Sequence, residues 1–198
     1  MGRALSNKVD QHLCQLMVLA SQASANVTGG NGGTEITDAD AKTNATSLIA
    51  SVFDANQALD ENDVPTTDRF CVVTPDVYYQ LCNVDKLVSR DFSSANGDFG
   101  KGSVVNIGGV PVIKSNTAVT AFTDQSAAIS GTNNTYNVDA QHVGAVVFHK
   151  SAVGTVKLED MVMENTYDPR RIGNLLTSRL ALGHGILRPE SAVRIIAQ

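Results

Sequence analysis

The sequence is poor in the residues on which several common kinds of binding depend. It contains no Trp, and aromatic side chains make up 5% of its 198 residues, so no platform for stacking bases or sugars is evident. Its 15 basic and 20 acidic side chains give a net charge of −5, which argues against tight binding of nucleic acid over a broad surface. No apolar run approaches the ~18 residues of a membrane span, and no apolar signal segment follows Met1. We therefore expect a soluble, unexported protein.

Cysteine is also scarce, and its number and setting predict free thiols. Cys14, Cys71 and Cys82 lie in apolar stretches, which is typical of buried thiols made in a reducing cytosol rather than of a disulfide framework. A chain of this length hides roughly 70% of the surface of its unfolded form, so its core needs no disulfide or metal. The four His residues form no His-x-x-x-His pair and the cysteines no Cys-x-x-Cys pair, so we expect neither a metal site nor a cofactor.

Two helices are predicted in the first third of the chain. Apolar residues recur at steps of three and four from Leu5 to Ala20, opposite a polar face that includes Gln15. Because no capping residue precedes this helix, we expect it to continue upstream in a longer parent chain. The glycine run Gly29–Gly33 predicts a flexible stop. A second helix would begin after Thr37 as its N-cap, with an apolar face formed by Leu48, Ile49, Val52, Phe53 and Leu59.

The rest of the chain reads as strands and loops. Apolar runs predict strands at Phe70–Val73 and Gly144–His149, and Gly108-Gly109 predicts a hairpin that joins Ser103–Ile107 to Val110–Lys114. Residues 116–141 are small, polar and aperiodic, which indicates a long surface excursion. A long strand with one apolar face is predicted by the alternating positions Leu176, Ser178, Leu180, Leu182, His184 and Ile186. Helices and strands mix without βαβ repetition, which is typical of the α+β class.

Two features are candidates for catalysis, and each also has an ordinary structural explanation. The glycine-rich segment Ser93–Gly102 is only faintly similar to a phosphate-binding loop, because two positions that such a loop needs hold Ala95 and Gly102. His184 lies between Gly183 and Gly185, which a close-packed strand with a crowded backbone explains as well as a catalytic turn does. A small cytosolic α+β enzyme that uses His184 and this loop stays open as an alternative.

Long strings of residues, strongest in the last fifty positions, resemble a known family. Phe148–Leu158 reads FHKSAVGTVKL and Leu182–Glu190 reads LGHGILRPE, and both closely resemble the major capsid protein of short-tailed, T7-type bacteriophages. Val64–Arg69 and Pro75–Tyr78 look like the central region of the same family, and Asn106–Ile113 falls where its hairpin would be. The resemblance spans nearly the whole chain.

The resemblance implies the Hong Kong 97-type capsid fold, an α+β architecture with a peripheral and an axial domain. Residues 1–33 would be the peripheral domain, with its spine helix at about Ala4–Ala23, and residues 34–164 the axial domain, a mixed sheet with flanking helices. Residues 165–198 would return to the peripheral domain, with a long strand beside the spine helix. Family members carry an amino-terminal arm and an extended loop before that helix, and we expect this chain to lack both.

The implied function is structural. It is that of a major capsid subunit, with no enzymatic activity and no cofactor, that assembles with copies of itself into the hexamers and pentamers of an icosahedral phage shell around double-stranded DNA. Further expected partners are scaffolding and portal proteins during assembly and, non-specifically, the packaged DNA; no membrane partner is expected. The protein would be made in the bacterial host cytoplasm and reside in the virion. A phage tail or scaffold interaction module is a further alternative.

Charge is distributed unevenly along the chain, which indicates where copies would meet. Residues 35–68 hold eight acidic side chains and one Lys, whereas residues 150–198 hold seven basic and five acidic ones. We expect the acidic stretch of one copy to face the basic tail of the next. The candidate interface residues are Asp60, Glu61, Asp63, Arg170, Arg171 and Arg188. Exposed pairs contribute ~0–1 kcal/mol each, so ordinary solvated surface is the alternative for any one of them.

Overall fold

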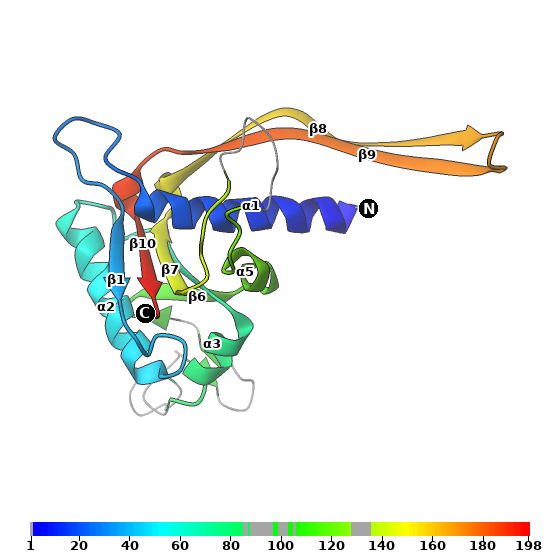
Figure 1. Cartoon of the computed structure of the whole chain (residues 1–198). Coiled ribbons are helices and arrows are strands. Elements are labelled where there is room, and N and C mark those ends of the chain that lie inside the picture. The colour runs from blue at the N-terminus through cyan, green and yellow to red at the C-terminus, as the bar shows by residue number, and fades with distance from the viewer. Residues whose placement is uncertain (1, 85–86, 88–96, 99–102, 105, 128–135) are drawn as a thin grey trace.

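The computed structural model describes residues 2–84, 87, 97–98, 103–104, 106–127 and 136–198. A β-sheet with helices on both faces forms the body of the molecule, and a long two-stranded hairpin runs above the first helix and projects away from this body (Figure 1). Among the helices of the described residues, none has both the length and the apolar character that crossing a membrane requires.

The body is built on a six-stranded mixed sheet with the strand order β1-β10-β7-β2-β6-β5. β1 runs parallel to β10 and β2 parallel to β6, whereas the other neighbours are antiparallel. The two predicted apolar strands are confirmed, and they are the central pair of the sheet. The strands are β1 (Thr34–Thr37), β2 (Arg69–Val73), β5 (Asn106–Ile107), β6 (Val110–Lys114), β7 (Val143–His149) and β10 (Ala192–Ile196).

Two apolar cores lie on opposite faces of this sheet. On one face, α2 (Ala45–Glu61) and α3 (Pro75–Leu81) pack against Cys71 and Val73 of β2. On the other, α1 (Gly2–Gln22) and α5 (Asn116–Ala121) pack against Val72. Because successive residues of β2 enter different cores, both faces of the central strands are buried. The predicted α+β class is confirmed, and all three cysteines are buried and free, as expected.

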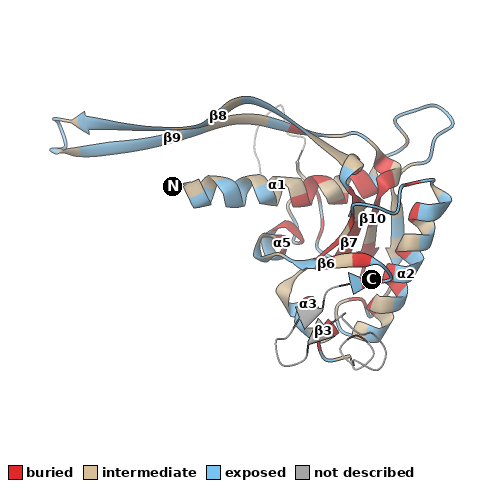
Figure 2. Ribbon diagram, turned by 180° about the vertical axis from the view of Figure 1, so that it is seen from behind, coloured by how far each residue is buried: buried red, intermediate tan, exposed pale blue. Residues whose placement is uncertain are grey.

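The helix α1 confirms the predicted amphipathic helix but buries one residue of its expected polar face. Its buried residues lie in its second half, from Cys14 to Ser21, and its first half is more exposed (Figure 2). Gln15 was expected to face solvent and is 1% exposed instead. Its side-chain amide donates a hydrogen bond to the side chain of Gln125 (3.4 Å). A buried Gln is stable when it finds such a partner, and helical periodicity cannot foresee that partner.

The helix α2 begins later than predicted. Thr37 is not its N-cap, because Thr37 is the last residue of β1 and the helix starts at Ala45. Its N-cap is Asn44, whose side-chain oxygen accepts a hydrogen bond from the backbone N–H of Thr46 (3.0 Å). Phe53, expected on the apolar face, is 52% exposed. The Phe53 ring lies at the turn between β5 and β6, where a Cβ on Gly108 would be 2.8 Å from it.

The predicted two-glycine hairpin forms between β5 and β6. Gly108 (φ +58°) and Gly109 (φ +84°) take the left-handed conformations that a type I′ turn needs. Ser103–Val104 (β4) was expected in the same hairpin but pairs with Gly97–Asp98 (β3) instead. The remaining residues of the candidate phosphate loop at Ser93–Gly102 lie outside the described residues, so the structure does not test that prediction.

A segment that was expected to be an open loop is packed against the body. Residues 116–141 are not an open excursion: within their described part α5 forms, and Ala118, Phe122 and Val138 are buried in the core under α1. Only the end of the glycine run lies against the body. A Cβ on Gly33 would clash with the carbonyl oxygen of Ala20, so this glycine permits a close approach of the chain to the end of α1, whereas a Cβ on Gly29 would meet nothing within 4 Å. The flexibility of the run stays a prediction.

A long hairpin formed by β8 (Val153–Asp168) and β9 (Gly173–Ile186) joins the body through two short 3-10 turns, Lys150–Ala152 and Pro189–Ser191. The predicted long strand is confirmed as β9, which contacts α1. The three-part division at residues 33 and 164 stays a prediction, and its second boundary falls inside the continuous strand β8.

Candidate subunit interface

The outer half of the β8–β9 hairpin stands clear of the rest of the described chain. The two strands pair from Val153 and Ile186 at the base to Asp168 and Gly173 at the tip. Near the middle, the Met161 side chain reaches α1, where its Cε atom lies 3.5 Å from the position of a Cβ on Gly2. Beyond Met161 most residues are exposed, and both views show the tip away from the body (Figures 1 and 2).

One face of this outer half carries large apolar side chains. Residues paired across the two strands share a face, and the register pairs Met163 with Ser178, Asn165 with Leu176 and Tyr167 with Asn174. We call Met163, Tyr167 and Leu176 the apolar tip face. They are 56%, 60% and 53% exposed. The apolar tip face lies on the same side of the hairpin as Met161, which contacts α1. Large apolar side chains on this side therefore continue beyond the first residue of α1.

The opposite face of the hairpin carries ion pairs between its two strands. Arg179 Nε lies 3.0 Å from Glu159 Oε1, and Arg179 Nη2 lies 3.6 Å from Glu164 Oε1. Both pairs join β9 to β8 and are exposed, so each contributes only modestly to stability. The ion pairs of this face thus form within the chain, and Leu175 is its one large apolar side chain in the outer half that is half exposed (50%).

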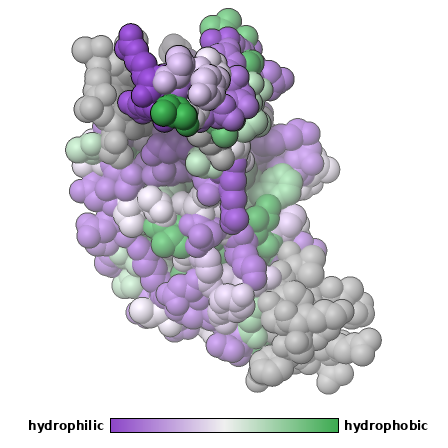
Figure 3. All heavy atoms as spheres, turned by 90° about the vertical axis from the view of Figure 1, so that its right-hand side faces the viewer, coloured by the Kyte–Doolittle hydropathy of each residue, from purple (hydrophilic) through white to green (hydrophobic). Residues whose placement is uncertain are grey.

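The turn at the tip presents two predicted interface residues. The backbone N–H of Arg170 donates to a carboxylate oxygen of Asp168 (3.0 Å), which shapes the turn, and Arg170 is exposed. The Arg171 side chain is 84% exposed, with its Nε 3.9 Å from Asp168. Ile172 is also 84% exposed and has φ +50°, an unfavourable conformation for a β-branched residue. Seen from this end, hydrophilic and hydrophobic side chains are mixed over the tip (Figure 3).

The predicted acidic residues lie at the other end of the molecule, where α2 ends (Figure 1). Glu61 and Asp63 are exposed there. Asp60 has a partner within the chain: its Oδ1 is 2.6 Å from Nη2 of Arg69, which is 5% exposed and also donates to the Val64 carbonyl oxygen. Asp60 therefore stabilises the body.

Arg188 lies near the acidic end rather than at the hairpin tip. Its Nε is 2.7 Å from Glu190 Oε1, and the Asn62 amide, directly after α2, donates to the Glu190 carbonyl oxygen (3.5 Å). Within one chain the structure thus brings Arg188 close to the end of α2, whereas Arg170 and Arg171 are far from it. Whether any of the six candidates touches another copy remains a prediction.

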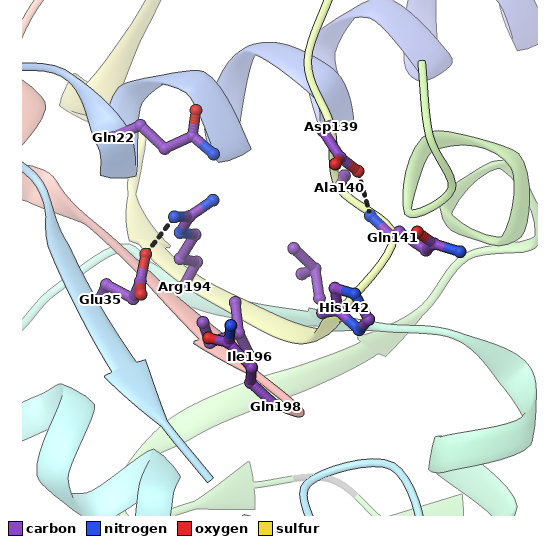
Figure 4. A pocket seen from close by; sticks show the side chains of 10 residues that line it. Gln22, Glu35, Asp139, Ala140, Gln141, His142, Arg194, Ile196 and Gln198 are labelled. Carbon is purple, nitrogen blue, oxygen red and sulfur yellow. Dashed lines mark hydrogen bonds and ion pairs between the residues drawn. The ribbon is translucent and has the colours of Figure 1, made fainter. Parts of the chain in front are cut away.

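A hollow of about 280 Å³ lies between the end of α1, the β1–β10 edge and the loop before β7 (Figure 4). Glu35 on β1 is ion-paired with Arg194 on β10. Asp139 accepts a hydrogen bond from the backbone N–H of Gln141 (3.1 Å). Both carboxylates thus hold the sheet edge and the loop in place. Among the described residues, no group of three or more His, Cys, Asp or Glu side chains is arranged to hold a metal.

His184, the catalytic candidate, lies on β9 at the base of the hairpin and is 8% exposed. Its Nδ1 is 2.8 Å from the Thr155 hydroxyl, so it joins β9 to β8. The expected backbone crowding is wrong, because a Cβ on Gly183 or Gly185 would meet nothing within 4 Å. His184 is a structural residue in this setting, and the glycines beside it are not required by packing.

Three comparisons identify the relatives of this chain. A family model described as Gp10A-like major capsid protein matches residues 1–196. The major capsid protein of Enterobacteria phage T3 is 30% identical in an alignment over 159 residues that covers 75% of this chain and 46% of that protein, so the chain spans about half the length of this relative. The capsid of the cyanophage P-SCSP1u superimposes with a TM-score of 0.89 at 32% identity, over 100% of this chain and 64% of that one.

The mature capsid of bacteriophage PhiM1 shows the same fold, with a TM-score of 0.79 at 24% identity over 99% of this chain and 62% of that one. The expected Hong Kong 97-type capsid fold is thus confirmed, and the catalytic alternative is set aside because the matching family consists of structural proteins. The chain belongs to the Gp10A-like family of phage major capsid proteins.

Proposed function

We propose that this chain is a shell-forming subunit that associates with copies of itself into hexamers and pentamers of an icosahedral capsid around double-stranded DNA. The observation that carries the proposal is the projecting hairpin with its uncovered apolar tip face. A two-stranded ribbon is at best marginally stable in water, and it gains stability when a third layer covers its apolar side. A neighbouring copy supplies that layer in a shell.

The size of the apolar tip face fits a contact that adds up over many subunits. Burying a large apolar side chain contributes ~1.5–3 kcal/mol, so Met163, Tyr167 and Leu176 together contribute several kcal/mol when a neighbour covers them. Such a contribution is small for a single interface, as suits a shell in which many weak contacts form and correct themselves during growth.

The charges at the two ends of the molecule support the same proposal. The hairpin tip carries Arg170 and Arg171, and the end of α2 carries Glu61 and Asp63 at the opposite end of the body. One chain cannot bring these ends together, but a row of identical chains can place the tip of one on the acidic end of the next. Such head-to-tail contacts close into rings when the rotation between copies allows it. Charge complementarity here mainly sets the partner and its orientation.

The finer partners follow from the same proposal. Scaffolding and portal proteins would meet the growing shell at its subunit edges. The packaged DNA would contact the wall without sequence preference. It would not adhere to the wall, because a net charge of −5 repels phosphate backbones. The chain would be made in the host cytoplasm and reside in the virion.

Charge reversal at the two ends tests the head-to-tail contact. Arg170→Glu with Arg171→Glu should reduce assembly at low salt, and Glu61→Lys with Asp63→Lys should do the same, measured by light scattering and negative-stain microscopy. An equimolar mixture of the two variants should regain hexamers, since the variants can alternate around a ring of six so that each tip meets an opposite charge, whereas a ring of five keeps one contact between like charges.

The control is Arg3→Glu with Lys8→Glu, which reverses two exposed cations of α1 away from the tip and from the end of α2. This variant should assemble as the unmodified chain does. Assembly of the tip variant at the unmodified level, or a mixture that assembles no better than its components, would contradict the proposed contact.

A further inference from the structure

Three aromatic rings from distant parts of the chain meet where the hairpin base crosses α1. His12 is on α1, Tyr136 precedes β7, and His184 is on β9. The His12 and Tyr136 rings are stacked, with centroids 4.8 Å apart and planes at 11°. The Tyr136 and His184 rings are 6.0 Å apart at 63°. We call these three residues the clasp, because they connect the long helix, the loop before β7 and the hairpin.

The hydrogen bonds of the clasp suit neutral imidazoles. The hydroxyl of Tyr136 accepts a hydrogen bond from the backbone N–H of His184 (3.0 Å), and His184 Nδ1 pairs with the Thr155 hydroxyl (2.8 Å). The Nε2 atoms of His12 and His184 are inaccessible to water and have no hydrogen-bond partner in the described part of the chain. A protonated imidazole carries an N–H on both nitrogens, so protonation would add a buried and unsatisfied donor to either ring.

The charged groups around the clasp also oppose protonation. Burial lowers the pKa of His12 below its ordinary value, and the positive charges of Lys8 on the same helix and of His184 lower that pKa further. Burial lowers the pKa of His184. Thr155 on β8 and Tyr136 before β7 are neutral neighbours, and no carboxylate in the described part of the chain raises either pKa. A proton is therefore bound more readily when the rings are reached by water.

We propose that the clasp of His12, Tyr136 and His184 is a proton-sensitive connection that holds the base of the β8–β9 hairpin against α1 when both imidazoles are neutral and releases it when they take up protons. The released state binds protons at Nε2 with the ordinary affinity of an exposed histidine, whereas the closed state does not. The closed state is therefore fully favoured above about pH 6.5 and loses its advantage as the pH falls from there through the lowered pKa values. This property belongs to the single chain and does not depend on the proposed assembly.

Amide hydrogen exchange of the full chain at about pH 7.5 and about pH 5.5, corrected for the intrinsic effect of pH on exchange, measures the release. Protection of the His184 amide at the hairpin base, which donates to the Tyr136 hydroxyl across the clasp, should fall by about tenfold for each histidine that titrates, because the pH is then one unit below the ordinary pKa. Protection of the buried strand β2 should change less. Light scattering of the same samples reports assembly separately, so a failure of assembly is not mistaken for a failure of the clasp.

Two variants decide the outcome. His12→Gln with His184→Gln keeps polar side chains but cannot bind the proton, so the ratio of protection between the two pH values should approach one at the hairpin base, whatever the stability of the variant. His142→Gln, which changes an exposed histidine outside the clasp, should keep the full response. An unchanged ratio in the unmodified chain, or a full response in the double variant, would overturn the proposal. NMR titration of the histidine rings gives an independent check, since ordinary titration of His12 and His184 near pH 6.5 would also overturn it.

Discussion

The sheet of the body and the outer half of the hairpin use similar apolar residues in opposite settings. Val147 and Ile195 in the body are fully buried, because helices cover both faces of their strands, whereas Met163, Tyr167 and Leu176 are each more than half exposed. In the body, apolar burial stabilises the fold of one chain. In the hairpin the same surface is available to stabilise contacts between chains. The comparison separates residues that determine folding from residues that we propose determine assembly.

Truncation of one leucine in each region should give the largest difference in the free energy of unfolding between the two variants. Leu48→Ala removes a fully buried side chain and should lower the free energy of unfolding by about 2–5 kcal/mol. Leu176→Ala, on the apolar tip face, should change it by less than about 0.5 kcal/mol while reducing assembly. Urea denaturation followed by circular dichroism measures the first quantity and light scattering the second. Equal losses of stability in both variants would remove the distinction between the two regions.

Adding one methyl group to a glycine of each region should give a smaller difference in stability between the two variants. Gly33→Ala would force a Cβ against the backbone at the end of α1, and it should destabilise the chain by about 1–3 kcal/mol. Gly183→Ala, in the open hairpin, meets nothing within 4 Å and should leave the stability unchanged or raise it by up to about 0.5 kcal/mol. Thermal unfolding of the pair measures both. A strongly destabilised Gly183→Ala would show that the hairpin is more crowded than the body at these positions.

Mild acid should lower the stability of the body by protonating one of its buried histidines, His149. His149, at the end of β7, is 6% exposed, and its Nδ1 is 2.7 Å from the Ser151 hydroxyl. Burial lowers the pKa of His149, and the charge of Lys150 lowers it further, whereas Asp68 raises it. The body should thus keep the contribution of neutral His149 to its stability above about pH 6.5 and lose this contribution as the pH falls from there through the lowered pKa.

Urea denaturation at about pH 7.5 and about pH 5.5 measures this loss. The loss should be smaller in His149→Gln, whereas the release of the clasp at the hairpin base should be unchanged in that variant. An equal loss in His149→Gln and in the unmodified chain would show that the acid response of the body comes from other groups.

The regular parts of the fold could be predicted from the sequence because their signals are local. The three- and four-residue spacing of α1, the apolar runs of β2 and β7 and the glycine pair of the β5–β6 turn each report the conformation of their own segment. The predicted start of α2 was wrong for a related reason. Thr37 and Asn44 are both good N-cap residues, and the pairing of Thr37 with Ile196 in β10 decides between them. That pairing joins residues far apart in the sequence, so no local pattern contains it.

The surfaces that we propose for assembly were the least predictable part. The alternation in β9 predicted one apolar face without telling how much of it would be covered, and β9 is buried at His184 but open at Leu176. The arginines at the tip were identified by charge alone, which did not reveal that they lie at the opposite end of the molecule from Glu61. Asp60 has the same charge as its neighbours and is distinguished only by the buried Arg69 beside it.

The inner half of the hairpin rests on α1 as far as Met161, and its outer half projects beyond this contact as a lever. The part of β8 from Met161 to Asp168 spans roughly 23 Å. A rotation of about 12° at Met161 therefore displaces the tip by about 5 Å, nearly the width of one strand spacing. The packing of Met161 on α1 consequently sets the position of Arg170, the proposed contact residue, although Met161 is not near the tip. Small differences in angle at this pivot would let identical chains reach neighbours at unequal distances without any change in the body.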